Sequence, residues 1–115
     1  MHELSIATAI LERVELEASK RPGIRVTKVG VRVGELSGVD PDALSFGFEA
    51  LVKDTVLDPL ALDIELCARK QRCPACGTTF FVKDYDVVCP QCREPATECV
   101  SGNELDIAYL EVAEE

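Results

Sequence analysis

Residues 3–20 carry hydrophobic side chains at the three- and four-residue spacing of an amphipathic helix. Glu12, Glu15 and Glu17 fall on other faces, so the pattern predicts one buried stripe. The segment Arg21-Pro22-Gly23 should end the helix, because proline cannot continue the hydrogen-bond ladder and glycine favours the turn that follows. The predicted buried stripe consists of Leu4, Ala7, Ile10, Leu11, Val14 and Ala18.

A second helix is predicted from Asp40 to about Lys53. The Asp40 side chain can accept hydrogen bonds from the first backbone N–H groups of this helix, and Pro41 suits its first turn. The apolar face of this helix would consist of Leu44, Phe48, Leu51 and Val52.

Three segments have the composition of β-strands. Residues 24–36 alternate valines with polar or small residues, and residues 60–68 alternate cleanly, which implies a sheet with one solvated face. Residues 105–112 form the third segment, which must pair with the earlier ones because a lone strand is not stable. The apolar side of residues 60–68 would be Leu62, Ile64, Leu66 and Ala68. The predicted fold class is therefore α+β, with a small three-stranded sheet packed against two helices.

The segment between the second and third strands is rich in cysteine and interrupts the sheet. It contains Cys73-Pro74-Ala75-Cys76 and, after twelve intervening residues, Cys89-Pro90-Gln91-Cys92. We therefore expect one α/β domain from residues 1–68 and 104–115, with an inserted metal-binding module over residues 69–103. At 115 residues the chain has the length of one domain with a small appendage.

Two Cys-x-x-Cys pairs at this spacing predict a zinc-ribbon-like site with four thiolate ligands, Cys73, Cys76, Cys89 and Cys92. Residues 78–82 and 85–88 read as the arms of a hairpin, with Lys83-Asp84 as its turn. So short a module has almost no core of its own. Metal binding is therefore expected to supply most of its folding free energy.

Other uses of these cysteines remain open from the sequence. The four could form two disulfides in a secreted module, or they could bind a single iron, as in rubredoxin-like electron carriers. No signal peptide and no apolar stretch of about 18 residues is apparent, so we expect a cytoplasmic protein with reduced thiols and no membrane segment. Cys67 and Cys99 lie outside the pairs and are interpreted as core or surface thiols.

Composition and charge narrow the classes of function. Apolar residues make up 47% of the chain, enough for a modest core, and the formal charge is −9. Nucleic-acid binding is disfavoured, because only residues 69–72 form even a short basic run. The chain has a single histidine, no Ser/His/Asp set and no Gly-rich phosphate loop, so the sequence gives little support to an enzyme.

That single histidine is His2, next to the chain start. The Met1 amine, the His2 amide nitrogen and the His2 imidazole can close fused chelate rings around one ion. The first N–H groups of a helix have no intrahelical partners, and a nitrogen-rich planar donor set favours Ni(II) or Cu(II) over tetrahedral zinc. A solvated terminal histidine is the alternative interpretation, and Glu3 alone reads as an acid that suits the helix dipole.

Taken together, three stretches resemble the hydrogenase maturation nickel metallochaperone family (HypA/HybF type). They are Met1-His2-Glu3-Leu4-Ser5, the segment Val31-Arg32-Val33-Gly34-Glu35-Leu36-Ser37-Gly38-Val39, and the two Cys-Pro-x-Cys pairs. The resemblance covers nearly the whole chain in the same order. From the residues alone, the segment after Val33 has no ligand role and is interpreted as a strand-to-helix turn.

The resemblance implies a metallochaperone and not an enzyme. It implies transported Ni(2+) at Met1, His2 and Glu3, and structural Zn(2+) at the four paired cysteines. It further implies delivery of nickel to the large subunit of [NiFe] hydrogenase, and in some relatives to urease, with a nucleotide-hydrolysing partner of the GTPase type. The sequence leaves monomer and homodimer open. The alternative function is a zinc-ribbon protein-interaction module with no transported metal.

Overall fold

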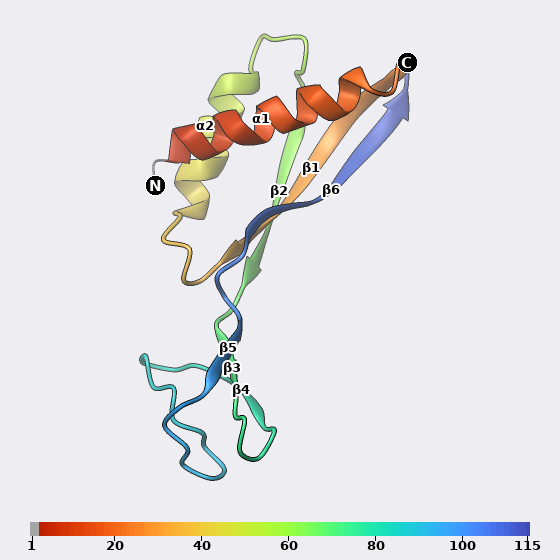
Figure 1. The fold of residues 1–115 in the computed structure, drawn as a ribbon. Coiled ribbons are helices and arrows are strands. Elements are labelled where there is room, and N and C mark those ends of the chain that lie inside the picture. Colours follow the sequence, from red (N-terminus) through yellow and green to blue (C-terminus); the bar gives the residue numbers. More distant parts are fainter. Residues whose placement is uncertain (1–2) are drawn as a thin grey trace. The chain divides into compact units, whose positions relative to one another are not determined.

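The computed structural model describes residues 3–115, which divide into two compact units (Figure 1). The first unit comprises the chain up to Arg32, residues 38–65 and residues 106–115. The second comprises residues 33–37 and 66–105, and contains all the paired cysteines. Unlike the predicted insertion, which begins at residue 69, the second unit also includes residues 33–37.

Two helices belong to the first unit. α1 spans Glu3–Ser19 and α2 spans Pro41–Val52. The Asp40 carboxylate caps α2 as predicted, because its Oδ1 accepts from the N–H groups of Asp42 (3.0 Å) and Ala43 (3.4 Å). Neither of these described helices is long and apolar enough to cross a membrane. The buried helical residues are Ile6, Ala7, Ile10, Leu11, Val14, Leu44, Gly47, Phe48 and Val52.

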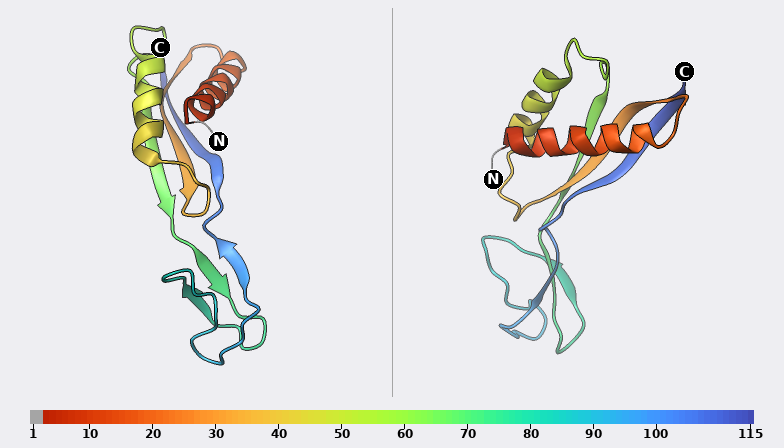
Figure 2. Two further views of the ribbon diagram at one scale, coloured as in Figure 1. Left: turned by 90° about the vertical axis from the view of Figure 1, so that its left-hand side faces the viewer. Right: turned by 45° about the horizontal axis from the view of Figure 1, so that its top comes forward.

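The sheet of the first unit has the strand order β2-β1-β6. Its strands are β1 (Ile24–Gly34), β2 (Ala61–Cys67) and β6 (Leu105–Glu114). The two helices pack against each other and cover the sheet (Figure 2). Within this unit, the β1 residues Val26, Val29 and Val31 are buried. The predicted fold class, two helices with a three-stranded sheet and a cysteine module, is confirmed.

One part of the predicted alternation is wrong. Leu62 and Ile64 of β2 are half-buried, as the pattern requires, but Leu66 is 66% exposed and Cys67 is half-buried. The change occurs where β2 passes from the first unit to the second, between Glu65 and Leu66. The strand therefore no longer borders the core that imposed the alternation.

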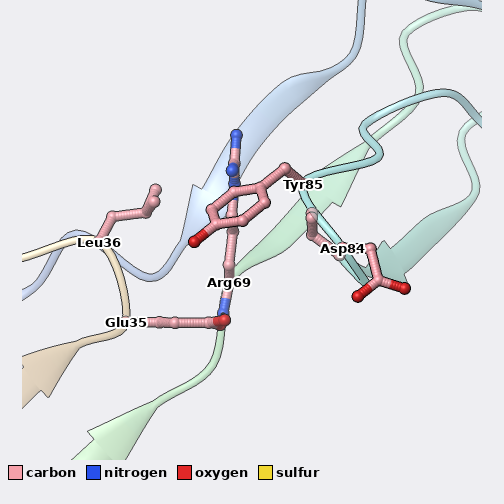
Figure 3. A pocket seen from close by; sticks show the side chains of 6 residues that line it. Glu35, Leu36, Arg69, Asp84 and Tyr85 are labelled. Carbon is pink, nitrogen blue, oxygen red and sulfur yellow. The ribbon is translucent and has the colours of Figure 1, made fainter.

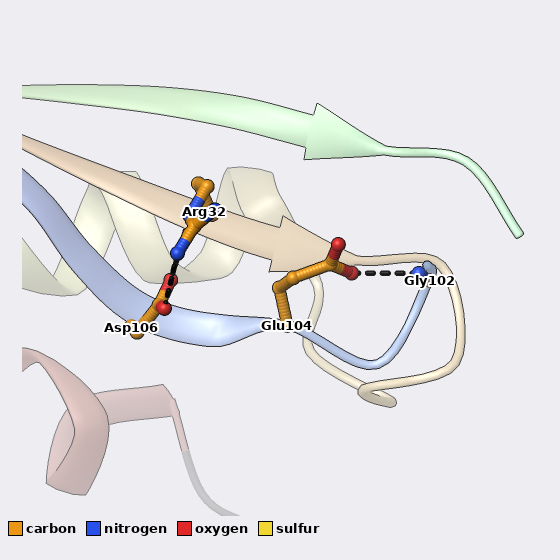
Figure 4. A network of polar contacts seen from close by, with 4 residues as sticks. All are labelled: Arg32, Gly102, Glu104 and Asp106. Atoms are coloured by element: carbon orange, nitrogen blue, oxygen red, sulfur yellow. Dashed lines mark hydrogen bonds and ion pairs between the residues drawn. The ribbon is translucent and has the colours of Figure 1, made fainter. Parts of the chain in front are cut away.

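The Tyr109 side chain crosses the sheet over Gly30 in the central strand. The Tyr109 ring, from β6, lies over Gly30 of β1, where an added Cβ would come within 2.1 Å of the ring. The Tyr109 hydroxyl donates to the Asp63 carboxylate on β2. On the same sheet, Arg32 donates two hydrogen bonds to Asp106, of 3.0 and 2.6 Å (Figure 4). Side chains thus link all three strands.

The sheet of the second unit differs from the predicted hairpin. Its strand order is β4-β3-β5, with β3 (Lys70–Arg72), β4 (Thr79–Phe81) and β5 (Glu98–Ser101). The arm predicted at residues 78–82 is confirmed as β4, but β4 pairs with β3 and not with residues 85–88. Residues 85–88 are not a strand, and their prediction is wrong.

Side chains use the backbone groups that such a second arm would need. The Val88 N–H donates to Asp86 Oδ1 (3.0 Å), and the Val87 carbonyl accepts from the Thr97 hydroxyl. The tight turn lies over residues 83–86, closed by the Asp86 N–H donating to the Lys83 carbonyl (3.0 Å). Local side-chain bonds have therefore replaced the ladder.

Two glycines allow close backbone packing in the second unit. An added Cβ at Gly34 would lie 2.1 Å from the Gly102 carbonyl oxygen. An added Cβ at Gly102 would lie 2.7 Å from the Arg69 Cα. The Gly102 N–H also donates to Glu104 Oε1 at 2.6 Å (Figure 4). Residues 34–36 are thereby held against the segments on both sides of the cysteine loops.

The bond between Tyr109 and Asp63 is testable by titration. The Asp63 carboxylate raises the pKa of Tyr109 from 10.0 to about 12, because it holds the phenol proton. The stabilisation is complete below pH 10 and is lost as the pH rises through about 12. Asp63→Asn should therefore lower the Tyr109 transition in an ultraviolet titration of tyrosinate, with Tyr109→Phe identifying that transition. An unchanged transition in Asp63→Asn would contradict the assignment.

Candidate metal centre

The four paired cysteines meet at one point of the second unit. Their sulfur atoms all lie within 4.8 Å of one another. Cys73 Sγ lies 3.5 Å from Cys92 Sγ, and Cys76 Sγ lies 3.6 Å from Cys89 Sγ. These separations are far longer than the S–S bond of about 2.05 Å, so neither pair is a disulfide. Cys73 and Cys89 are buried, whereas Cys76 and Cys92 are exposed.

Both pairs are set in the same backbone turn. In the first, the Gly77 N–H donates to the Cys73 carbonyl (2.8 Å); in the second, the Arg93 N–H donates to the Cys89 carbonyl (3.0 Å). The fifth residue after the first cysteine also matches in the two turns. The Thr78 carbonyl accepts from the Cys73 N–H, and the Glu94 carbonyl accepts from the Cys89 N–H.

The residue after each pair takes positive φ, 80° at Gly77 and 67° at Arg93. Glycine adopts this conformation freely, whereas arginine adopts it at a cost. The second turn therefore keeps the geometry of the first in spite of its sequence, as expected if the metal ligands impose it.

Residues that the sequence did not single out support the cluster. Thr78 Oγ1 lies 3.2 Å from Cys76 Sγ. Buried Gln71, in the central strand β3, donates from Nε2 to Thr97 Oγ1 (3.1 Å), and Thr97 donates to the Val87 carbonyl. This chain of hydrogen bonds fixes the loop that carries the second pair. Only the tertiary structure identifies Gln71 and Thr97, because their hydrogen-bond partners lie 10 to 26 positions away.

The sulfur atoms influence one another's protonation. Hydrogen bonding with Thr78 lowers the pKa of Cys76 to about 6, well below the ordinary value of a thiol. A backbone hydrogen bond at Glu94 lowers the pKa of Cys92, but the bond with Cys73, burial and the other cysteines outweigh it and raise this pKa to about 12. Four thiolates so close together repel one another, so a bound cation stabilises the cluster.

The cluster fits a tetrahedral metal ion. Zinc–sulfur bonds of about 2.3 Å in a tetrahedron place the sulfur atoms about 3.8 Å apart. The separations of 3.5 Å (Cys73–Cys92) and 3.6 Å (Cys76–Cys89) lie close to this value. The predicted convergence of Cys73, Cys76, Cys89 and Cys92 thus gives a sulfur cluster whose donor set suits a soft cation.

Of the three residues predicted to bind nickel, the structure describes only Glu3. Met1 and His2, predicted to bind nickel, lie outside the described residues. Glu3 is the first residue of α1 and is half-buried. Cys67 and Cys99 do not belong to the cluster, and the Cys99 thiol donates to the Ser101 carbonyl (3.3 Å).

Comparison with known proteins establishes the family. The model of a family described as "Hydrogenase/urease nickel incorporation, metallochaperone, hypA" matches residues 1–112. The chain belongs to the HypA family. This is the family of nickel metallochaperones for hydrogenase maturation, and the resemblance identified from the sequence is confirmed.

Individual HypA proteins match over nearly their full length. The hydrogenase maturation factor HypA of Geobacter metallireducens is 42% identical over 112 residues, 97% of this chain and 99% of that relative. The HypA of Wolinella succinogenes is 41% identical over 116 residues, 100% of this chain and 98% of the relative.

Two solution structures share the fold at 27% sequence identity. One, of a HypA protein, has a TM-score of 0.74 and is matched over 100% of this chain and 98% of that chain. The other is the Ni metallochaperone HypA from Helicobacter pylori, with a TM-score of 0.66 and full coverage of both chains. The fold described above is therefore that of the HypA family.

Removing one sulfur from the cluster should remove the metal and unfold the cysteine loops. Three ligands hold a structural ion poorly, and metal binding supplies folding free energy to so small a unit. For Cys73→Ser we expect less than about a tenth of the wild-type metal content by elemental analysis. Amide exchange in residues 66–105 should become fast, while α1 and α2 stay protected.

Cys99→Ser is the matched control, because Cys99 lies in the same unit but outside the cluster. It should retain the metal content and the amide protection of the wild type. A Cys73→Ser protein with a full equivalent of metal and unchanged protection would show that the cluster is not a metal centre.

Proposed function

We propose that this protein is a nickel carrier that binds Ni(II) at Met1, His2 and Glu3 and delivers it to the large subunit of [NiFe] hydrogenase. Structural zinc is held by Cys73, Cys76, Cys89 and Cys92. The observation that carries the proposal is the family match over residues 1–112, which includes both the amino-terminal residues and the cysteines. No catalytic step is assigned to the protein, and it acts in the cytoplasm.

The donor types explain why two metals would occupy two sites. Four thiolates in a tetrahedron suit zinc, because its filled d shell imposes no other geometry. The amine, amide and imidazole nitrogens at the chain start suit the planar coordination that Ni(II) prefers. Glu3, in the first turn of α1, follows them in the sequence and would add a carboxylate. Each ion would therefore favour its own site.

Different lability would follow from the setting of the two sites. Zinc would be held by two turns of a folded unit and would leave only if that unit opened. Nickel would be held by consecutive residues at one chain end, and its release would require no unfolding of the sheet or helices. A carrier needs this second property, because it must give its cargo away.

The partners follow from the same assignment. The large subunit of [NiFe] hydrogenase is the client, and a nucleotide-hydrolysing nickel protein of the GTPase type assists transfer. Urease, which the family description also names, is a second client class. We further propose that residues 1–68 and 104–115 act as the nickel-binding domain and residues 69–103 as the zinc-binding domain.

Replacing His2 tests nickel binding directly. In untagged, zinc-loaded protein, His2→Ala should abolish stoichiometric Ni(II) binding by titration calorimetry, because it removes the imidazole that closes the chelate. Zinc content and the thermal midpoint should stay unchanged. A short amino-terminal extension should weaken nickel binding almost as much, because it removes the chelating amine without changing any side chain.

Two outcomes would count against this assignment. Equal nickel titration by wild type and His2→Ala would exclude a site at the chain start. Wild-type protein that binds zinc but no nickel would instead support an interaction module with no transported metal. Conversion of Cys99 to serine is the control for unspecific thiol binding of nickel, and it should leave the titration unchanged.

A further inference from the structure

Glu35 and Leu36, in a segment that has no ligand role in the sequence, form one wall of a pocket in the second unit. The Glu35 N–H donates to the Cys67 carbonyl (2.9 Å), and the Glu35 carboxylate accepts from the Arg69 N–H (2.7 Å). The Leu36 N–H donates to the Gly102 carbonyl. Backbone hydrogen bonds therefore fix Glu35 and Leu36, and their side chains line the same pocket as Arg69.

The pocket has a volume of about 290 Å³ (Figure 3). All its lining residues belong to the second unit: Glu35, Leu36, Arg69, Val82, Asp84 and Tyr85. Three carry charge and three offer apolar surface. A volume near the lower end of small-molecule sites, roughly 300 Å³, suits one or two amino-acid side chains with their peptide group.

Arg69, one of the lining residues, carries an unsatisfied donor. Its backbone is fully bonded, because its N–H donates to Glu35 and its carbonyl accepts from the Val82 N–H (3.1 Å). Its Nε atom, in contrast, is buried and has no hydrogen-bond partner. A buried N–H group without an acceptor is rare in folded proteins and costs stability. The structure therefore points to a missing oxygen acceptor at Arg69.

Tyr85 is held in an unfavourable position at the same pocket. It is 89% exposed, although a large aromatic side chain gains nothing from facing water. Its φ is +63° and that of Asp84 is +52°, a left-handed conformation that bulky residues disfavour. Asparagine or glycine would suit this turn better, so the turn does not require tyrosine. Strain of this kind concentrates at binding sites.

We propose that this pocket docks an extended peptide segment of the hydrogenase large subunit. An oxygen of that segment accepts from Arg69 Nε, and an apolar side chain packs against Leu36, Val82 and Tyr85. Peptide is the best match, because one peptide group offers both the acceptor for Arg69 and an N–H donor for Glu35 or Asp84. Arginine and tyrosine are also the residues that most often dominate protein interfaces. The identity of the partner rests on the proposed function.

Binding of the purified large-subunit precursor to the zinc-loaded chain tests the proposal. Arg69→Met removes the donor but keeps the aliphatic stem, and Tyr85→Asn removes the ring while suiting the positive φ. Each should weaken binding by about tenfold or more in an interferometry assay. Arg72→Met is the matched control, because it removes one charge from the same unit but does not line the pocket. Its affinity should stay within about twofold of the wild type.

Two further readouts separate docking from a structural role. The thermal midpoint of Tyr85→Asn should equal or exceed that of the wild type, because the strained turn is relieved. In nuclear magnetic resonance spectra, the Arg69 Nε–H signal should shift when overlapping synthetic peptides of the precursor are titrated, and one peptide should account for the shift. The Arg72 signal should not move with it.

Wild-type binding with equal binding by Arg69→Met and Tyr85→Asn would overturn the docking pocket and leave the proposed delivery function standing. No binding of the precursor by wild-type protein would overturn both the pocket's assignment and delivery to this client. Nickel titration of the same samples reports separately on cargo binding, so loss of docking with intact nickel binding is the expected pattern for both pocket variants.

Discussion

The constraint on which the second unit depends is the convergence of four cysteine sulfur atoms, which all lie within 4.8 Å of one another. Apart from the cysteines, this unit buries little apolar surface: among the described residues, its fully buried hydrophobic side chains are Val33, Cys73 and Cys89. So small a unit cannot offset its loss of conformational entropy by hydrophobic burial alone. An ion coordinated by the cluster would replace the missing core, and folding of the unit would then be linked to metal binding.

Over its described residues, the first unit is stabilised by a hydrophobic core and not by a metal cluster. Its core comes from α1, α2 and the β1 residues Val26, Val29 and Val31, a hydrophobic core of the kind that the second unit lacks. It also carries most of the negative charge: seven Lys and Arg against fifteen Asp and Glu give −8, whereas five against six give −1 in the second unit. An acidic unit attracts cations.

Local patterns in the sequence predicted most of the elements but few of their partners. Periodicity located α1, α2 and the strands of the first sheet, and spacing alone predicted that the four cysteines converge. It failed at residues 85–88, where Asp86 and Thr97 take the backbone groups that a strand would need. It also gave no signal for β3 and β5, which are short and depend on pairing with distant residues.

The role of residues 34–36 was equally hidden from the sequence. Their contacts with Arg69 and Gly102 join positions more than thirty residues apart, and no local propensity encodes such contacts. In the same way, the unpaired Arg69 Nε and the strain at Tyr85 appear only in three dimensions. These departures from local rules lie where binding to other molecules is proposed, as expected when function and not folding has selected the residues.

X-ray absorption at the zinc and nickel edges of one untagged sample, loaded with both metals, tests most directly whether two ions occupy two unlike sites. Four sulfur neighbours at about 2.3 Å are expected at the zinc edge, and only nitrogen and oxygen neighbours are expected at the nickel edge. Sulfur in the nickel shell, or loss of zinc when nickel is added, would contradict a permanent thiolate site separate from a labile nitrogen site.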